Sequence, residues 1–182
     1  IHAAPNPQND RRWLHKGSHV EPVPRVQATT SVKACGGVAF GGKTKLHLYR
    51  GGIDGDDYKK ILKKVLIPGG DKMFGDDDWL LLHDRAPYHA AANVVEFLDD
   101  KHHQHVTSEW PPHSPDLNCI ENVWAILKHN VGLHGATTQA RLEKRVREEW
   151  KRIPQHLIDN MVESMPQRLR AVIAAKGDHT HY

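Results

Sequence analysis

Two carboxylates, Asp84 and Glu121, stand out because each lies beside an apolar segment. Asp84 follows the apolar run at residues 79–82, with only His83 between them, and Glu121 comes later with 36 residues between the two carboxylates. A continuous apolar run is typical of a strand covered on both faces, and ligand sites in open α/β sheets gather just beyond the carboxyl ends of such strands. Asp84 is therefore placed where a ligand site of such a sheet would lie.

Glu121 lies at the start of a predicted amphipathic helix. The apolar residues recur at the spacing of one helix face: Ile120, Val123, Trp124, Leu127 and Val131. Glu121 falls on the flank of this stripe, where a side chain can border a sheet and still reach water. A structural alternative stays open, since Asn118 and Glu121 also have the spacing of a capping box. In that case Glu121 would accept from the N–H of Asn118, and Asp84 would merely end a strand.

The segments around both carboxylates resemble a known family. HDRAPYH (residues 83–89) and SPDLNCIENVW (residues 114–124) resemble the second and third catalytic segments of mariner-superfamily DDE transposases. Residues 35–68 resemble the family's glycine-punctuated strand pair and first helix, and residues 148–182 resemble its C-terminal helices. The resemblance implies an α/β, RNase H-like fold, a mixed sheet flanked by helices. We expect the catalytic core at residues 1–135, with its first strand missing or truncated, and a C-terminal helical extension at 136–182 packed on it.

The resemblance also implies an activity, the metal-dependent cleavage and transfer of DNA strands. Asp84 and Glu121 would be its catalytic, metal-binding residues, and the complete family site holds two Mg²⁺ or Mn²⁺ ions. The expected partners are the transposon ends and target DNA, the expected location is the nucleus, and a homodimer is possible.

The family's first catalytic Asp lies on a strand upstream of Ile1, and Asp10 would fall in the turn after that strand. We therefore expect weak or absent metal binding by this chain alone. The alternative function is that of an inactive remnant that binds nucleic acid or a partner.

Three further residues could belong to the pocket. Arg85 stands where the family usually has Asn. Its side chain would point away from Asp84 if the strand continues, or pair with Asp84 or Glu121 if the chain turns, and the following Ala-Pro favours the turn. His89 could line the pocket or cap the next helix. Asn122 adjoins Glu121 and is the third candidate.

A basic cluster marks the C-terminal third of the sequence. It lies on a predicted helix and consists of Arg141, Lys144, Arg145, Arg147, Lys151 and Arg152. The apolar stripe of the same helix is Leu142, Val146, Trp150 and Ile153. The cluster is either a solvated face of a packed helix or a surface that contacts DNA phosphates. Arg141, Lys144, Arg145 and Lys151 are the candidate DNA-binding residues.

Composition sets broader bounds. A chain of 182 residues with 38% hydrophobic residues suits one domain with a substantial core. A net charge of +3 permits DNA binding without requiring it. No apolar run has the length of roughly 18 residues that a membrane span needs, so no membrane association is expected. Two isolated cysteines predict neither a disulfide framework nor a thiolate metal site.

The pattern predicts strands first and then alternating helices and strands. Expected strands are residues 11–15, 31–40, 44–50, 79–84 and 105–108, and expected helices are residues 58–66, 90–101 and the helix from Ile120. Pro68 should stop the first of these helices. Beyond Thr137 the chain should be helical, with Thr137 or Thr138 as a cap and interruptions at Pro154 and Pro166.

Overall fold

The computed structural model describes residues 30–101, 103–106, 110–111, 114–132, 138–178 and 180. The strand expected at residues 11–15 and Asp10 lie outside the described residues. The strands are β1 (Lys33–Cys35), β2 (Val38–Ala39), β3 (Gly42–Lys43), β4 (His47–Tyr49), β5 (Leu81–Leu82) and β6 (His105–Val106). The helices are α1 (Gly55–Ile61), the π-helical turn η2 (Leu62–Leu66), α2 (Ile67–Phe74), α3 (Ala92–Asp100), the 3₁₀ turn η3 (Pro115–Leu117), α4 (Ile120–Gly132), α5 (Gln139–Arg152), α6 (Gln155–Glu163) and α7 (Met165–Ala174).

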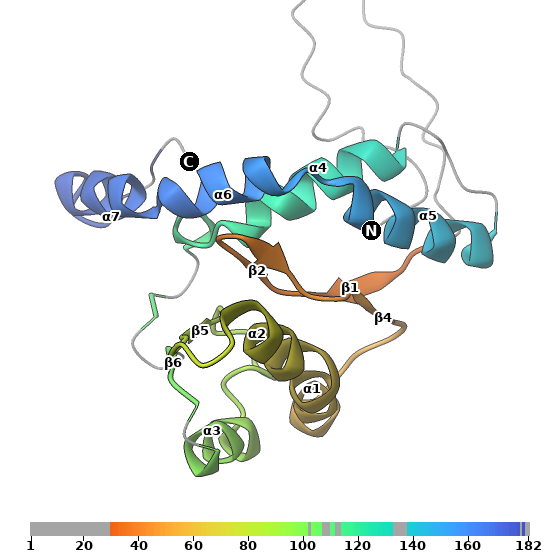
Figure 1. Cartoon of the computed structure of the whole chain (residues 1–182), viewed down its shortest axis with the longest axis horizontal. Coiled ribbons are helices and arrows are strands. Elements are labelled where there is room, and N and C mark those ends of the chain that lie inside the picture. The colour runs from red at the N-terminus through yellow and green to blue at the C-terminus, as the bar shows by residue number, and fades with distance from the viewer. Residues whose placement is uncertain are drawn as a thin grey trace, which may run out of the picture.

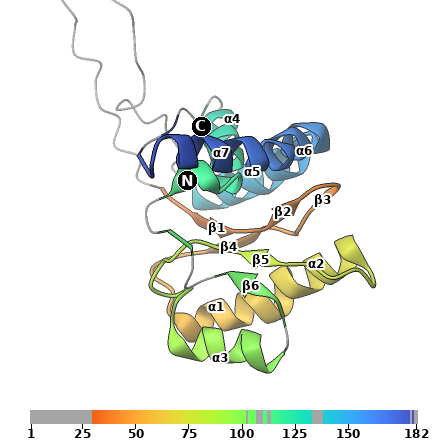
Figure 2. The same cartoon turned by 90° about the vertical axis from the view of Figure 1, so that its left-hand side faces the viewer.

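The strands form a middle layer between two layers of helices. Helices α1, α2 and α3 cover one side, and α4 to α7 cover the other (Figures 1 and 2). This arrangement, with both antiparallel and parallel strand pairs, confirms the expected mixed α/β fold class. None of the helices in the described part of the chain combines the length and the apolar composition that a membrane crossing needs.

The described strands pair two by two. β1 pairs with β4 and β2 with β3, both antiparallel, as successive parts of one hairpin. Gly41 lies at its tip with a φ of 76°, a conformation that glycine adopts without strain. β5 and β6 pair in parallel, with Leu81 opposite His105. Among the described residues no strand pairing joins β1 to β5.

The prediction that Pro68 stops the first helix is wrong. The helix begins at Gly55, where the Asp54 side chain accepts from the N–H of Asp57 at 2.9 Å, and it continues through η2 and α2 to Phe74. A proline inside a helix lacks one N–H and its ring collides with the carbonyl four residues earlier. The five-residue π turn directly before α2 widens the helix there, which accommodates Pro68 without ending it.

The strand expected at residues 79–84 is shorter than predicted. Only Leu81–Leu82 pairs as a strand, and Leu80 is 51% exposed. The apolar run is therefore not covered on both faces, because one side of it borders a cavity described below. The next helix, α3, spans residues 92–100 in place of the expected 90–101.

Two hydrophobic clusters lie on the two faces of the strand layer. The first joins α1, η2 and α3 through Tyr58, Ile61, Leu62, Leu66, Val94 and Leu98. The second joins the hairpin to α4, α5 and α6, and it contains the buried parts of both predicted stripes: Val123, Leu127, Val131, Leu142, Val146, Trp150 and Ile153. Helices α5 and α6 thus share one core with the hairpin and α4.

The ends of the C-terminal helices follow the predicted signals. The Thr138 side chain accepts from the N–H of Arg141 at 3.3 Å and caps α5. Pro154 separates α5 from α6, and Pro166 lies in the first turn of α7. Trp150 ties α5 to the hairpin, since its indole N–H donates to the carbonyl of Thr44 at 3.0 Å.

Candidate active site

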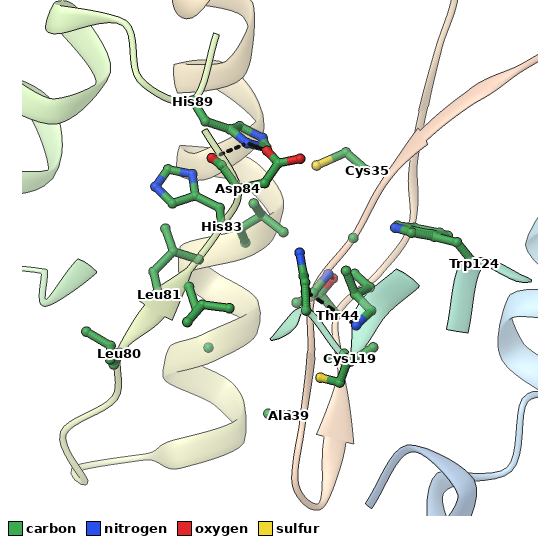
Figure 3. Close-up of a pocket in the computed structure, with 18 of the residues that line it drawn as sticks. Cys35, Ala39, Thr44, Leu80, Leu81, His83, Asp84, His89, Cys119 and Trp124 are labelled. Atoms are coloured by element: carbon green, nitrogen blue, oxygen red, sulfur yellow. Dashed lines mark hydrogen bonds and ion pairs between the residues drawn. The ribbon is translucent and has the colours of Figure 1, made fainter. Parts of the chain in front are cut away.

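Asp84 lies just beyond β5, at the point where the chain turns. Its Oδ1 accepts from the N–H of Ala86 at 3.0 Å, and the N–H of His89 donates to the carbonyl of Ala86 at 2.8 Å. The same Oδ1 lies 2.6 Å from Nδ1 of His89, the contact drawn as a dashed line in Figure 3. The short turn thus folds His89 back onto the carboxylate.

These contacts keep Asp84 ionised. The hydrogen bond from His89 lowers the pKa of Asp84, and the Ala86 N–H adds to the effect, against the opposing influence of burial. A carboxylate that stays charged is the form that a hard cation binds. Both hydrogen bonds reach Oδ1, so neither occupies the second oxygen, Oδ2.

Glu121 lies in the first turn of α4, and its side chain is exposed. Its N–H donates to the carbonyl of Asn118 at 3.0 Å. The capping-box alternative is not observed, because the N–H of Asn118 donates to the carbonyl of Pro115 at 3.1 Å. The side-chain oxygen of Asn118 instead accepts a long hydrogen bond, of 3.4 Å, from the N–H of Ile120.

Two cavities lie at the carboxylates, and Asp84 and Glu121 line both of them. The larger has a volume of about 470 Å³ and extends between the hairpin and the segment that contains β5. The smaller, of about 300 Å³, is bordered by residues 84–87 on one side and by Trp110, Pro111, Ser114, Pro115 and Asn118 on the other. The two residues that the sequence analysis paired therefore border the same two cavities.

The donor set fits a divalent ion only in part. Asp84 and Glu121 supply hard oxygen ligands to one cavity. In the described part of the chain, however, no group of three or more His, Cys, Asp or Glu residues is arranged to hold a metal ion. Two carboxylates leave most of the coordination sphere of such an ion to water or to groups from elsewhere.

The other predicted pocket residues differ in position. Arg85 is exposed and lines the smaller cavity, and none of the ion pairs within the described residues includes it. The predicted pairing of Arg85 with Asp84 or Glu121 is thus not observed. His89 lines the larger cavity, and Ala91, not His89, is the N-cap residue of α3. Asn122 lines neither cavity, and its buried Oδ1 has no hydrogen-bond partner among the described residues.

Behind Asp84 lies a group of rings that the sequence analysis missed. The ring centroid of Tyr58 lies 5.9 Å from that of His83 and 4.4 Å from that of His89, and the Tyr58 hydroxyl lies 3.3 Å from Nδ1 of His83. Burial, together with the neighbouring His89, lowers the pKa of His83 to about 3, so this imidazole is neutral at pH 7. These rings support the turn at Asp84. In the sequence, His83 appeared only as the first residue of the HDRAPYH segment.

Cys35 is a second residue that sequence reasoning did not place in the site. It lines the larger cavity from the hairpin, and Asp84 lines it from the β5 side (Figure 3). Burial raises the pKa of the Cys35 thiol to about 11, so the thiol is protonated and a poor metal ligand at neutral pH. No local signal in the sequence connects Cys35 with Asp84.

The basic cluster on α5 divides into two groups. Arg145 and Arg152 pair with the buried carboxylate of Glu149 at 3.4 and 2.7 Å, and Arg147 donates to the carbonyl of Leu46 at 3.1 Å. These three residues hold α5 in place. The other three members, Arg141, Lys144 and Lys151, are exposed, and Lys144 lies 4.0 Å from Glu148.

Comparisons with known proteins point in one direction. The family model described as DDE superfamily endonuclease matches residues 2–143. The Tcb1 transposase of Caenorhabditis briggsae is 32% identical over 132 residues, which cover 72% of this chain and 47% of that protein. The Tc1 transposase of Caenorhabditis elegans is 31% identical over 130 residues, with coverage of 71% and 46%. The chain thus spans about half the length of the curated relatives it matches.

Solved structures share the fold. The Mos1 mariner paired end complex with Mn matches with a TM-score of 0.73 at 18% identity, covering 92% of this chain and 52% of that one. The catalytic domain of Mos1 mariner transposase matches with a TM-score of 0.64 at 16% identity, covering 83% and 82%. A Mos1 paired end complex has also been solved with Mg.

Proposed function

Because the chain belongs to the DDE superfamily endonucleases, we propose that it is part of the catalytic domain of a transposase that cleaves and joins DNA with divalent metal ions. The observation that carries the proposal is that Asp84 and Glu121 line the same two cavities. Family membership favours this activity over that of a remnant that only binds nucleic acid. A chromosomal DNA substrate would require the protein to act in the nucleus.

Asp84 and Glu121 are the residues that would hold Mg²⁺ or Mn²⁺. When bound, such ions activate the attacking oxygen and stabilise the leaving oxygen of a phosphodiester. His89 keeps Asp84 ionised and leaves Oδ2 for other contacts. The exposed start of α4 presents Glu121 at the same cavity, where a DNA backbone can approach it.

The larger cavity is where we propose that a further strand completes this site. It is lined by residues 34–40 of the hairpin and by residues 79–84, and the large apolar side chains of Phe40 and Leu80 are 58% and 51% exposed there. Among the described residues, β1 pairs only with β4 and β5 only with β6, so each keeps an edge with backbone groups for a further strand. A further strand paired with these edges would bring a third carboxylate beside Asp84.

DNA would contact α5 through its exposed cations. Arg141, Lys144 and Lys151 are exposed, whereas Arg145 is committed mainly to the Glu149 ion pair. Such phosphate contacts give affinity without sequence specificity and weaken as salt rises.

The test uses a longer protein in which a strand ending in Asp-Glu precedes residue 1. We expect this protein to nick supercoiled DNA in Mg²⁺, and we expect Glu121→Gln to abolish the nicking, because an amide cannot supply the negative charge that holds a hard cation. Glu96→Gln, an exposed carboxylate on α3, is the matched control and should leave the rate unchanged. Metal-dependent nicking that survives in an Asp84→Asn variant would place the active site elsewhere.

A further inference from the structure

Arg168 on α7 is one of four buried polar or charged residues in the described part of the chain. It is only 4% exposed, and a buried guanidinium is costly unless its N–H groups are hydrogen-bonded. Its Nη1 donates to the backbone carbonyl of Asp116 at 3.0 Å, and its Nε donates to Oγ of Ser164 at 2.8 Å. Arg168 therefore ties the start of α7 to η3, a turn 52 residues earlier in the chain.

That turn leads directly into the start of α4. Asn118 follows η3 and donates its N–H to Pro115, and the carbonyl of Asn118 accepts the N–H of Glu121 at 3.0 Å. Backbone hydrogen bonds thus connect the segment that Arg168 holds with the residue that carries the carboxylate. A displacement of the Asp116 backbone would therefore also displace Asn118 and, with it, Glu121.

A second contact from the C-terminal end of the chain reaches the same residue. Oγ1 of Thr180 donates to Oδ2 of Asp116 at 2.9 Å, so the backbone and the side chain of Asp116 are both held. The positive charge of Arg168 also opposes the rise that burial causes in the pKa of Cys119, which places the guanidinium close to the chain on the other side of Asn118.

We propose that Arg168 is a positioning residue for the active site: by holding the carbonyl of Asp116 it fixes the turn that places Glu121 beside Asp84. The proposal rests on the proposed function for the role of Glu121. It assigns a part in the reaction to α7, which lies beyond residues 2–143, the range that the family model matches. Residues that orient metal ligands typically affect metal affinity or activity by roughly 10- to 100-fold when replaced.

The experiment measures Mn²⁺ binding to the 182-residue chain, through the paramagnetic broadening of the backbone NMR signals of Asp84 and Glu121. We expect Arg168→Gln to weaken the affinity by roughly 10-fold. Arg168→Lys keeps a cationic donor for the Asp116 carbonyl and should recover most of the affinity. Arg170→Gln is the matched control, because Arg170 is exposed on the same helix, and it should bind Mn²⁺ like the original chain.

A second readout does not depend on metal binding. The amides of Asn118 and Glu121 should exchange with deuterium faster in Arg168→Gln, while amides within α5 keep their rates. If Arg168→Gln does not fold, Thr180→Val and Ser164→Ala remove one hydrogen bond each and should give smaller changes in the same direction.

In the longer protein described above, the same variant should lower kcat more than it raises KM for DNA. Unchanged Mn²⁺ affinity and unchanged exchange in Arg168→Gln, or in both milder variants, would overturn the proposal. A failure of Arg168→Lys to recover affinity would equally overturn the role given to the Asp116 contact. Absence of Mn²⁺ binding in the original chain would agree with the lack of a third carboxylate among the described residues, and the exchange rates would then decide whether Arg168 holds the turn. Failure of the longer protein to nick DNA would count against the proposed function alone.

Discussion

At the scale of single residues, the fold lowers the pKa of one acidic side chain, Asp84, and of one basic side chain, His83. Asp84 stays ionised because His89 donates to it, and His83 stays neutral because it is buried beside Tyr58. A neutral His83 adds no positive charge that would compete with a cation for Asp84. The rings of His83 and Tyr58 also hold His89 from behind.

His83 makes the stability of the protein sensitive to acid. Its pKa is about 3 when folded and about 6.5 when unfolded, so between these values the unfolded chain binds about one more proton. His83 therefore leaves the free energy of unfolding unchanged above about pH 6.5 and lowers it as the pH falls from 6.5 towards 3. We expect His83→Phe, which keeps a ring against Tyr58, to flatten the dependence of the unfolding free energy on pH between 4 and 6.5, measured by urea denaturation. His129→Phe, at an exposed position, should leave that slope unchanged.

At the scale of elements, local sequence predicted those helices whose apolar stripes meet a core. The stripes of α4 and α5 followed from periodicity because one face of each helix is buried. Pro68 misled the prediction, because the π turn that tolerates it depends on tertiary packing. The strand predicted at residues 79–84 is longer than the observed one. The cavity beside Leu80 is lined by residues that are far away in sequence, so local sequence could not predict it. Local motifs singled out Asp84 and Glu121, which line the same cavities, whereas no local signal connects Cys35 with them.

A tight contact between α2 and the segment before β5 gives an element-level prediction. Ala is favoured over Gly inside a helix by up to about 1 kcal/mol. At Gly70, however, a Cβ would lie 2.5 Å from the ring of Trp79, whose indole N–H donates to Asp71 at 3.2 Å. We therefore expect Gly70→Ala to destabilise the protein by about 1–3 kcal/mol, measured by thermal unfolding. Gly52→Ala, where a Cβ meets open space, should change stability by less than about 0.5 kcal/mol.

At the scale of the whole molecule, both helical layers present exposed lysines that DNA could contact. The layer of α4 to α7 carries Lys144 and Lys151 on α5, and the opposite layer carries Lys64 and Lys72 on η2 and α2. All four lysines are exposed, so each pair can be replaced with the same change in net charge.

If α5 contacts phosphates, its lysines should affect DNA affinity more than the other pair does. We expect Lys144→Gln with Lys151→Gln to weaken binding and to reduce the slope of log affinity against log salt by roughly 2, about one unit for each contact. The control, Lys64→Gln with Lys72→Gln, should leave the slope nearly unchanged. Fluorescence anisotropy with a labelled duplex at several salt concentrations measures both. Equal effects of the two pairs would mean that only net charge matters and that α5 is a solvated face.

The cavity between the hairpin and β5 also has a consequence for how the molecule melts. No backbone hydrogen bond in the described part of the chain joins residues 51–106 to residues 30–50 or 114–178, so side-chain contacts alone connect the two hydrophobic clusters. We expect the halves to lose their structure in separate steps, with a calorimetric enthalpy larger than the van't Hoff enthalpy. A strand seated in the cavity would pair with both halves and merge the steps into one cooperative transition. The segment that completes the catalytic carboxylates would then also make the domain a single thermodynamic unit.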